Sequence, residues 1–170
     1  SNEITRNVQG WGSPDMENMY DLGADYHVIE EYPLALNEGN SWDRGVFCDG
    51  TNPLKITLCW VDPAAPETTI ASRALINNLD IHVTSPGGTE YWGNNGLGYD
   101  LWSSSGTGAQ RWSSSSSYRD DLNNVENVFI QTPEVGVWTV EVLGRTGDIA
   151  QGPQDFSVVA SGATGISSMG

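Results

Sequence analysis

The sequence predicts an all-β fold, a jelly roll or β-sandwich of about eight strands preceded by one short helix. Two observations predict this fold. Apolar and polar residues alternate in several short segments, and glycine- or proline-containing turns separate those segments. Alternation at every second residue places the apolar side chains on one face of a strand, as a half-buried sheet requires. At 170 residues, the chain is long enough for one such domain with a full core.

The first predicted element is a short helix that begins near Ser13 and ends at Gly23. Ser13 is a favourable N-cap residue, Pro14 suits the first helical position, and glycine commonly ends a helix. Helical spacing creates one apolar stripe, formed by Met16, Met19 and Tyr20. Little else surrounds this stripe in the sequence, so we expect it to need a packing partner.

Strands with clear alternation or turn signals are predicted at 54–60, 79–84, 89–92, 125–131, 137–143 and 156–160. Weaker strand candidates lie at 26–36 and 44–48. Trp60 and Trp138 lie on predicted strands and are expected in the core.

Residues 93–119 interrupt the strand pattern with glycines, eight serines and the two tryptophans Trp102 and Trp112. We interpret this stretch as a long surface excursion between two strands. Residues 163–170 are expected to form a tail after the last strand.

The charge of the chain excludes two classes of partner. Seven Lys and Arg residues stand against 22 Asp and Glu residues, which gives a net charge of −15. Nucleic-acid binding needs clustered basic residues, and an anionic membrane surface also attracts them, so neither partner is expected. No segment approaches the ~20 apolar residues of a membrane span. Polarity from Ser, Asn, Gly and Thr rather than from charge is common in secreted β-rich proteins, so we expect an extracellular protein.

The two cysteines, Cys48 and Cys59, do not settle the redox compartment. If they flank a direct hairpin that turns near Thr51, they lie roughly 17 Å apart. A disulfide requires Cα atoms within about 7 Å, so under that pairing both thiols stay free. Only a non-hairpin arrangement would join them.

Catalytic signals are few. The only histidines are His27 and His82, and neither lies in a nucleophile motif. The sequence contains no G-x-S-x-G elbow, HExxH motif, Walker sequence or CxxC pair. We therefore expect the chain alone to be no enzyme.

Acidic and amide side chains suggest a possible calcium site. Asn78 and Asp80 share one face of a predicted strand, and Asn124 and Glu126 share one face of another. Asp62, after a third strand, is an additional candidate ligand. Ca²⁺ takes six to eight oxygen ligands, which such strands could supply. The alternative is a polar network that fixes a loop, or solvated charge.

Three tryptophans lie in or beside the irregular stretch: Trp92, Trp102 and Trp112. Exposed indole rings on a β-sandwich can stack on the flat faces of sugars. The alternative interpretation is that they fix the excursion to the sandwich.

Several motifs together resemble the end of the catalytic domain and the following β-domain of long subtilisin-like serine proteases. The matching segments, in order, are Gly10-Trp11-Gly12, 54–63, Asn77-Asn78-Leu79-Asp80, Ser85–Gly88, Gly93-Asn94, Asn123–Val128, Gly136–Val140 and Gln154–Ser157. Their order and spacing hold from residue 10 to about residue 162. The chain departs from the family pattern at Asn78, where an acid is usual, and in the long excursion after Gly93.

The resemblance implies a serine endopeptidase domain upstream in the same polypeptide. Residues 1–23 would then be the end of that catalytic domain, and residues 24–162 the jelly-roll domain. In the family, the catalytic Asp, His and Ser all precede the Gly-Trp-Gly segment, so none is expected in this chain. The resemblance favours a non-catalytic accessory domain of a secreted protease. The alternative is a carbohydrate- or surface-binding module that uses the loop tryptophans.

Overall fold

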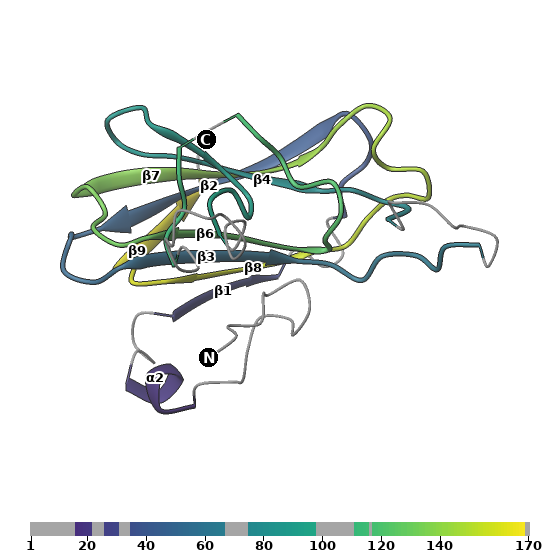
Figure 1. The fold of residues 1–170 in the computed structure, drawn as a ribbon. Helices are drawn as coiled ribbons and strands as arrows, with labels where there is room; N and C mark the ends of the chain where they lie inside the picture. The colour runs from purple at the N-terminus through teal and green to yellow at the C-terminus, as the bar shows by residue number, and fades with distance from the viewer. Residues whose placement is uncertain are drawn as a thin grey trace, which may run out of the picture.

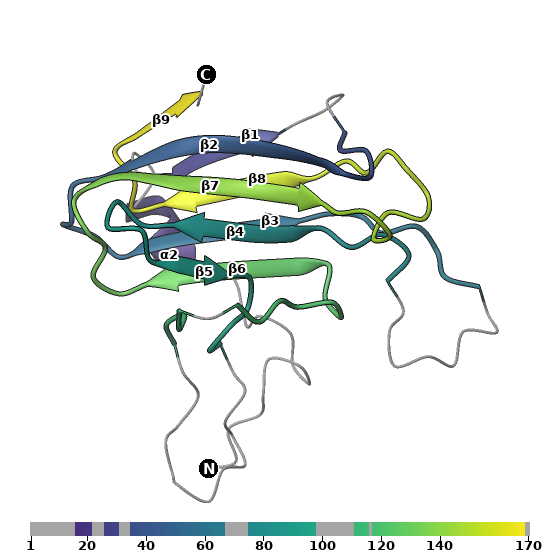
Figure 2. The same cartoon turned by 90° about the horizontal axis from the view of Figure 1, so that it is seen from above.

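The computed structural model describes residues 16–21, 26–30, 35–66, 75–97, 111–115 and 117–168. These residues form nine strands and one short helix, arranged as a β-sandwich of two antiparallel sheets (Figures 1 and 2). The all-β fold predicted from alternation and turn residues is confirmed.

Each sheet joins strands that are distant in the sequence. The four-stranded sheet contains, in spatial order, β1 (Tyr26–Glu30), β8 (Ser157–Ser161), β3 (Leu54–Cys59) and β6 (Val125–Ile130). The five-stranded sheet contains, in spatial order, β5 (Glu90–Trp92), β4 (Asp80–Thr84), β7 (Gly136–Gly144), β2 (Asn40–Cys48) and β9 (Gly165–Ser168). The described strands all pair in antiparallel fashion.

The core lies between the two sheets and follows the alternation seen in the sequence. The fully buried side chains of β3 are Leu54, Ile56 and Leu58. Those that β7 contributes from the opposite sheet are Trp138, Val140 and Val142. Trp60 is 5% exposed, so both tryptophans predicted in the core are found there.

The strand predictions succeed in the central strands and differ at the C-terminal end. Of the predicted strand at 26–36, residues 26–30 form β1 (Tyr26–Glu30) and Leu36 forms a bridge to Gln154, while residues 31–34 lie outside the described residues. The region predicted as a tail contains β9 (Gly165–Ser168), which pairs with β2. With one apolar residue, Ile166, β9 has no alternation to reveal it, and its pairing with the edge of β2 defines it.

The assumed hairpin between the cysteine-bearing strands is wrong. β2 pairs with β7 and β9, whereas β3 pairs with β6 and β8 in the other sheet. The sequence left open whether Cys48 and Cys59 would be joined in a non-hairpin arrangement, and in the structure both thiols are free.

The two ends of the predicted excursion pack against the sandwich. Gly93 and Leu97 are buried, and the Ser113 N–H donates to the Phe129 carbonyl at 2.7 Å. Trp102 lies outside the described residues. The excursion therefore leaves and rejoins the domain along the outer edge of β6.

The N-terminal helix is α2 (Met16–Asp21), and its predicted apolar stripe faces solvent where it is described. Met16 is 62% exposed and Tyr20 is 86% exposed. The predicted capping residues Ser13, Pro14 and Gly23 lie outside the described residues, as does the side chain of Met19. In the described part of the chain, no helix has the length and apolar character needed to span a membrane.

Candidate functional site

The most unusual feature of the structure is a group of buried carboxylates where the two sheets meet at one edge. We call Asp80, Asp120 and Glu126 the acidic cluster; all three are less than 10% exposed. β4 and β6 belong to different sheets but approach each other here. The closure is completed just after β5, where the Asn94 N–H donates to the Asn127 carbonyl at 2.8 Å.

Glu126 serves as a substitute strand partner for β4. β5 pairs with β4 only as far as the His82–Trp92 pair, and beyond it the Ile81 N–H donates to Glu126 Oε2 at 2.7 Å. The other carboxyl oxygen of Glu126 is buried without a hydrogen-bond partner. Burial raises the pKa of Glu126 well above its ordinary value, and the charges of Asp80 and Asp120 add to that rise. A carboxyl group in this setting favours its protonated form.

Asp80 lies on the outer face of β4 but is only 1% exposed. Arg119 Nη1 lies 3.4 Å from Asp80 Oδ2, and the Asn78 side-chain amide nitrogen lies 3.4 Å from Asp80 Oδ1. Burial raises the pKa of Asp80 to about 6, because the cost of removing a carboxylate from water outweighs the opposing effect of Arg119. Near neutral pH, Asp80 therefore carries a charge that Arg119 balances.

Asp120 organises the turn that leads into β6. Its Oδ1 accepts from the backbone N–H groups of Leu122 and Asn123 at 2.9 and 3.2 Å. Its Oδ2 accepts from the side-chain amides of Asn94 and Asn123 at 2.7 and 2.6 Å. Asn94, with a positive φ of 60°, also accepts the Asn127 N–H at 3.0 Å. These bonds fix Asp120 and the turn after β5 to each other.

Two of the predicted metal ligands serve the backbone instead. Both carboxyl oxygens of Asp62 accept backbone N–H groups, from Ile76 at 2.9 Å and from Asn77 at 2.7 Å. The amide nitrogen of Asn124, an exposed residue, donates to the Trp60 carbonyl at 3.0 Å. Of the five residues predicted as ligands, the structure brings together Asn78, Asp80 and Glu126.

The calcium prediction can be tested against this donor set. The side-chain atoms of Asn78 and Arg119 that face Asp80 are N–H donors, whereas a Ca²⁺ site needs converging oxygens. Within the described ranges, no three His, Cys, Asp or Glu side chains converge on a position that a metal ion could occupy. Asp62 and Asn124 are bonded to backbone groups instead, and the binding of calcium stays a prediction.

The tryptophans predicted to stack on sugars differ in their surroundings. The ring of Trp92 stacks on His82, with centroids 4.3 Å apart, and the Arg119 guanidinium lies 5.7 Å from its centroid. Trp112 is half-buried. Trp92 thus packs between His82 and Arg119, beside the acidic cluster, and ligand stacking by the tryptophans stays a prediction.

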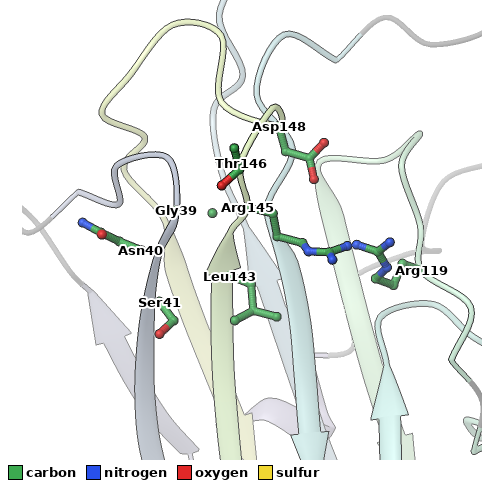
Figure 3. Close-up of a pocket in the computed structure, with 9 residues that line it drawn as sticks. Gly39, Asn40, Ser41, Arg119, Leu143, Arg145, Thr146 and Asp148 are labelled. Atoms are coloured by element: carbon green, nitrogen blue, oxygen red, sulfur yellow. The ribbon is translucent and has the colours of Figure 1, made fainter.

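Two hollows adjoin Arg119. The first, of about 360 Å³, is lined by Asn78, Asp80, Ser117, Tyr118, Arg119, Asp121 and Asp148. The second, of about 600 Å³, lies between the β2 and β7 ends and also includes Arg119 and Asp148. Figure 3 shows the side chains of Arg119 and Arg145 pointing toward each other, with Asp148 beside them. Acidic and basic side chains therefore gather at this end of the sandwich.

The potential nucleophiles and bases of the described region are poorly placed for catalysis. Burial raises the pKa of Cys48 to about 11 and also raises the pKa of Cys59, which keeps both thiols protonated. Nδ1 of His82 lies 2.8 Å from Glu141 Oε2, and its ring is covered by Trp92. His27 lies in β1, where its side chain is outside the described part of the structure.

The chain matches no protein-family model and no curated protein sequence. The likeness to subtilisin-like proteases therefore rests on the residues themselves.

Sequence reasoning missed Arg119, Asn94 and Asp120 as members of the site. Asp120 lies in a run of polar residues in which nothing distinguishes it from Asp121. Arg119 is one of only seven basic residues in an acidic chain, and this scarcity was the signal that could have identified it.

Proposed function

We propose that this chain is a non-catalytic β-domain that accompanies a secreted subtilisin-like serine endopeptidase. In this role it would stabilise the catalytic domain or shape access to its active site. The substrate pockets and the catalytic Asp, His and Ser would belong to the upstream domain of the same polypeptide.

One observation carries the proposal: the polar residues of the resembling motifs are those that hold the closed edge together. Asn94 and Asn127 bond across the edge, and Glu126 accepts the backbone N–H of β4. Asn77 forms a second network with Gln151 and Gln154. Buried polar side chains that bond to one another specify one packing arrangement. Their use in fixing the fold suits an accessory domain better than an active site.

The surroundings of the candidate nucleophiles also support the proposal. Cys48 is buried, and His82 is occupied by Glu141 and Trp92. A nucleophile needs an adjacent base that is itself oriented by a third group. The described residues present no such arrangement on one surface.

The proposal is tested on the parent enzyme. We expect the open reading frame upstream of Ser1 to encode the Asp, His and Ser of a subtilisin-like triad. We also expect a parent protease that lacks the β-domain, and so ends before residue 24, to lose activity faster at elevated temperature than the full-length protease. The purified 170-residue chain should not hydrolyse casein. A reading frame without the triad, or casein hydrolysis by this chain that is lost in His82→Ala, would contradict the proposal.

A further inference from the structure

We infer that Arg119 supplies the positive charge that balances the buried Asp80 carboxylate, at the place where the sequence alone predicts a calcium ion. The closed edge of the sandwich would then be held by an internal cation and would need no metal. The inference depends on the contacts around Asp80 and does not require the proposed parent protease.

The first support is the kind of atom that faces Asp80. Asn78 directs its amide nitrogen toward Asp80 Oδ1, and Arg119 directs Nη1 toward Oδ2, each at 3.4 Å. A metal ion would need the oxygen of Asn78 to face the same point as the carboxylate. Here that oxygen has no hydrogen-bond partner and is buried. The two groups that face Asp80 are therefore hydrogen-bond donors to a carboxylate, and one of them, Arg119, neutralises its charge.

The second support is that the remaining acids of the cluster are committed elsewhere. Both oxygens of Asp120 accept hydrogen bonds from the turn that leads into β6. Glu126 Oε2 accepts the Ile81 N–H. Turning Asp120 toward Asp80, or Glu126 Oε2 away from Ile81, would break these bonds, which together join the turn, β4 and β6.

The third support is that Arg119 is held in position. Its guanidinium lies 5.7 Å from the Trp92 ring centroid, and Trp92 is itself stacked on His82 of β4. A guanidinium is planar, permanently charged and weakly hydrated, so it can stack on an indole while it pairs with a carboxylate. The side chain of Asp80 is 2% exposed and that of Arg119 is 37% exposed, so Arg119 places its charge beside a carboxylate that is shielded from water.

Because Asn78 is neutral, the charged groups at this contact are one carboxylate, Asp80, and one guanidinium, Arg119. Arg119 also joins the segment that precedes β6 to the outer face of β4, 39 residues apart in the chain.

The test is thermal unfolding of the purified 170-residue chain in CaCl₂ or in EGTA at equal ionic strength. We expect the wild-type midpoint to agree within about 1 °C in the two buffers, because no ion binds the folded state selectively. Arg119→Gln should lower the midpoint by roughly 3–10 °C, because it leaves a buried carboxylate without its partner. The matched control is Arg111→Gln, an exposed arginine on the same segment, which should change the midpoint by less than about 2 °C.

A double-mutant cycle assigns the effect to the pair. In an Asp80→Asn background, Arg119→Gln should cost much less than in the wild type, because no buried charge is left to balance. If Arg119→Gln does not fold, Arg119→Lys takes its place in the cycle. This variant keeps the positive charge, and its effect on the midpoint should likewise be smaller in the Asp80→Asn background than in the wild type. A wild-type midpoint that rises in CaCl₂ would overturn the inference in favour of a bound ion. Equal effects of the Arg119 change in both backgrounds would overturn it too.

Discussion

At the scale of single residues, the buried carboxyl of Glu126 replaces a missing length of strand. The β4–β5 pairing ends at His82 and Trp92; the Gly93 N–H still donates to the Ile81 carbonyl, but the Ile81 N–H is accepted by a side chain from the opposite sheet. An unpaired backbone N–H in this position would cost about 1–3 kcal/mol, which explains why a carboxyl group is tolerated in the interior. In exchange, the buried Glu126 carboxyl group is harder to ionise, as its raised pKa reflects.

The raised pKa of Glu126 predicts how the stability of the fold depends on pH. The folded-state pKa of Glu126 lies above its unfolded value of 4.5, so the stabilising contribution is fully present below pH 4.5 and is lost as the pH rises through the folded pKa. Asp80 adds a loss in the same direction between pH 3.8 and about 6. We expect the melting midpoint to fall across this range, and to fall less steeply in Glu126→Gln, which cannot ionise.

Glu90→Gln is the control for that experiment, because the Glu90 side chain is 62% exposed. It removes one negative charge without changing the interior, so its pH profile should parallel that of the wild type. Parallel profiles for wild type and Glu126→Gln would contradict the burial argument.

At the scale of elements, the approach of β5 to β6 depends on a glycine. A Cβ added at Gly93 would lie 2.1 Å from Glu126 Oε2 and 2.7 Å from Glu126 Cβ. Real side chains do not approach this closely, so either β5 or β6 would have to shift. The segment after β5 then could not retain its bonds to Asn127.

We therefore expect Gly93→Ala to lower the free energy of unfolding by about 1–3 kcal/mol, as overpacking of a filled site does. Urea unfolding followed by tryptophan fluorescence measures this loss. Gly165→Ala, in the edge strand β9, is the matched control because a Cβ there has open space. Similar losses in the two variants would show that the close approach to Glu126 is not the cause.

The element scale also explains which strands were predictable. β3 and β7 face the core along their whole length, so their alternation is preserved in the sequence. β9 has only four residues and forms by pairing with the edge of β2, which the local sequence does not reveal.

At the scale of the whole molecule, the two sheets are joined by packing and by the closed edge, without a disulfide among the described residues. Cys48 lies in one sheet and Cys59 in the other, each with a raised pKa caused chiefly by burial. A chain of this size can form its core without covalent links.

We expect two reactive thiols to appear only when the chain unfolds. Ellman's reagent should label Cys48 negligibly and Cys59 slowly in native buffer, and both rapidly in denaturant, because a buried thiol is seldom ionised. Dithiothreitol should leave the melting midpoint unchanged. Fewer than two thiols in denaturant without reductant would instead indicate a disulfide.

The sequence by itself determined the class of fold, the central strands and the residues of the core. These follow from alternation, which is a local property: each side chain in a half-buried strand is sorted by polarity regardless of which strand lies beside it. The same property located Asp80 and Glu126 on strands and placed Trp60 and Trp138 in the interior.

Only the tertiary structure decided the pairing of strands and the chemistry of the site. β2 and β3 lie in different sheets because each pairs with strands far away in the sequence. Arg119 likewise meets Asp80 although the two are 39 positions apart. The sequence pattern could not distinguish carboxylates that would share a metal ion from carboxylates that accept N–H groups. That distinction depends on the direction from which each partner approaches, and the packing of the two sheets sets this direction.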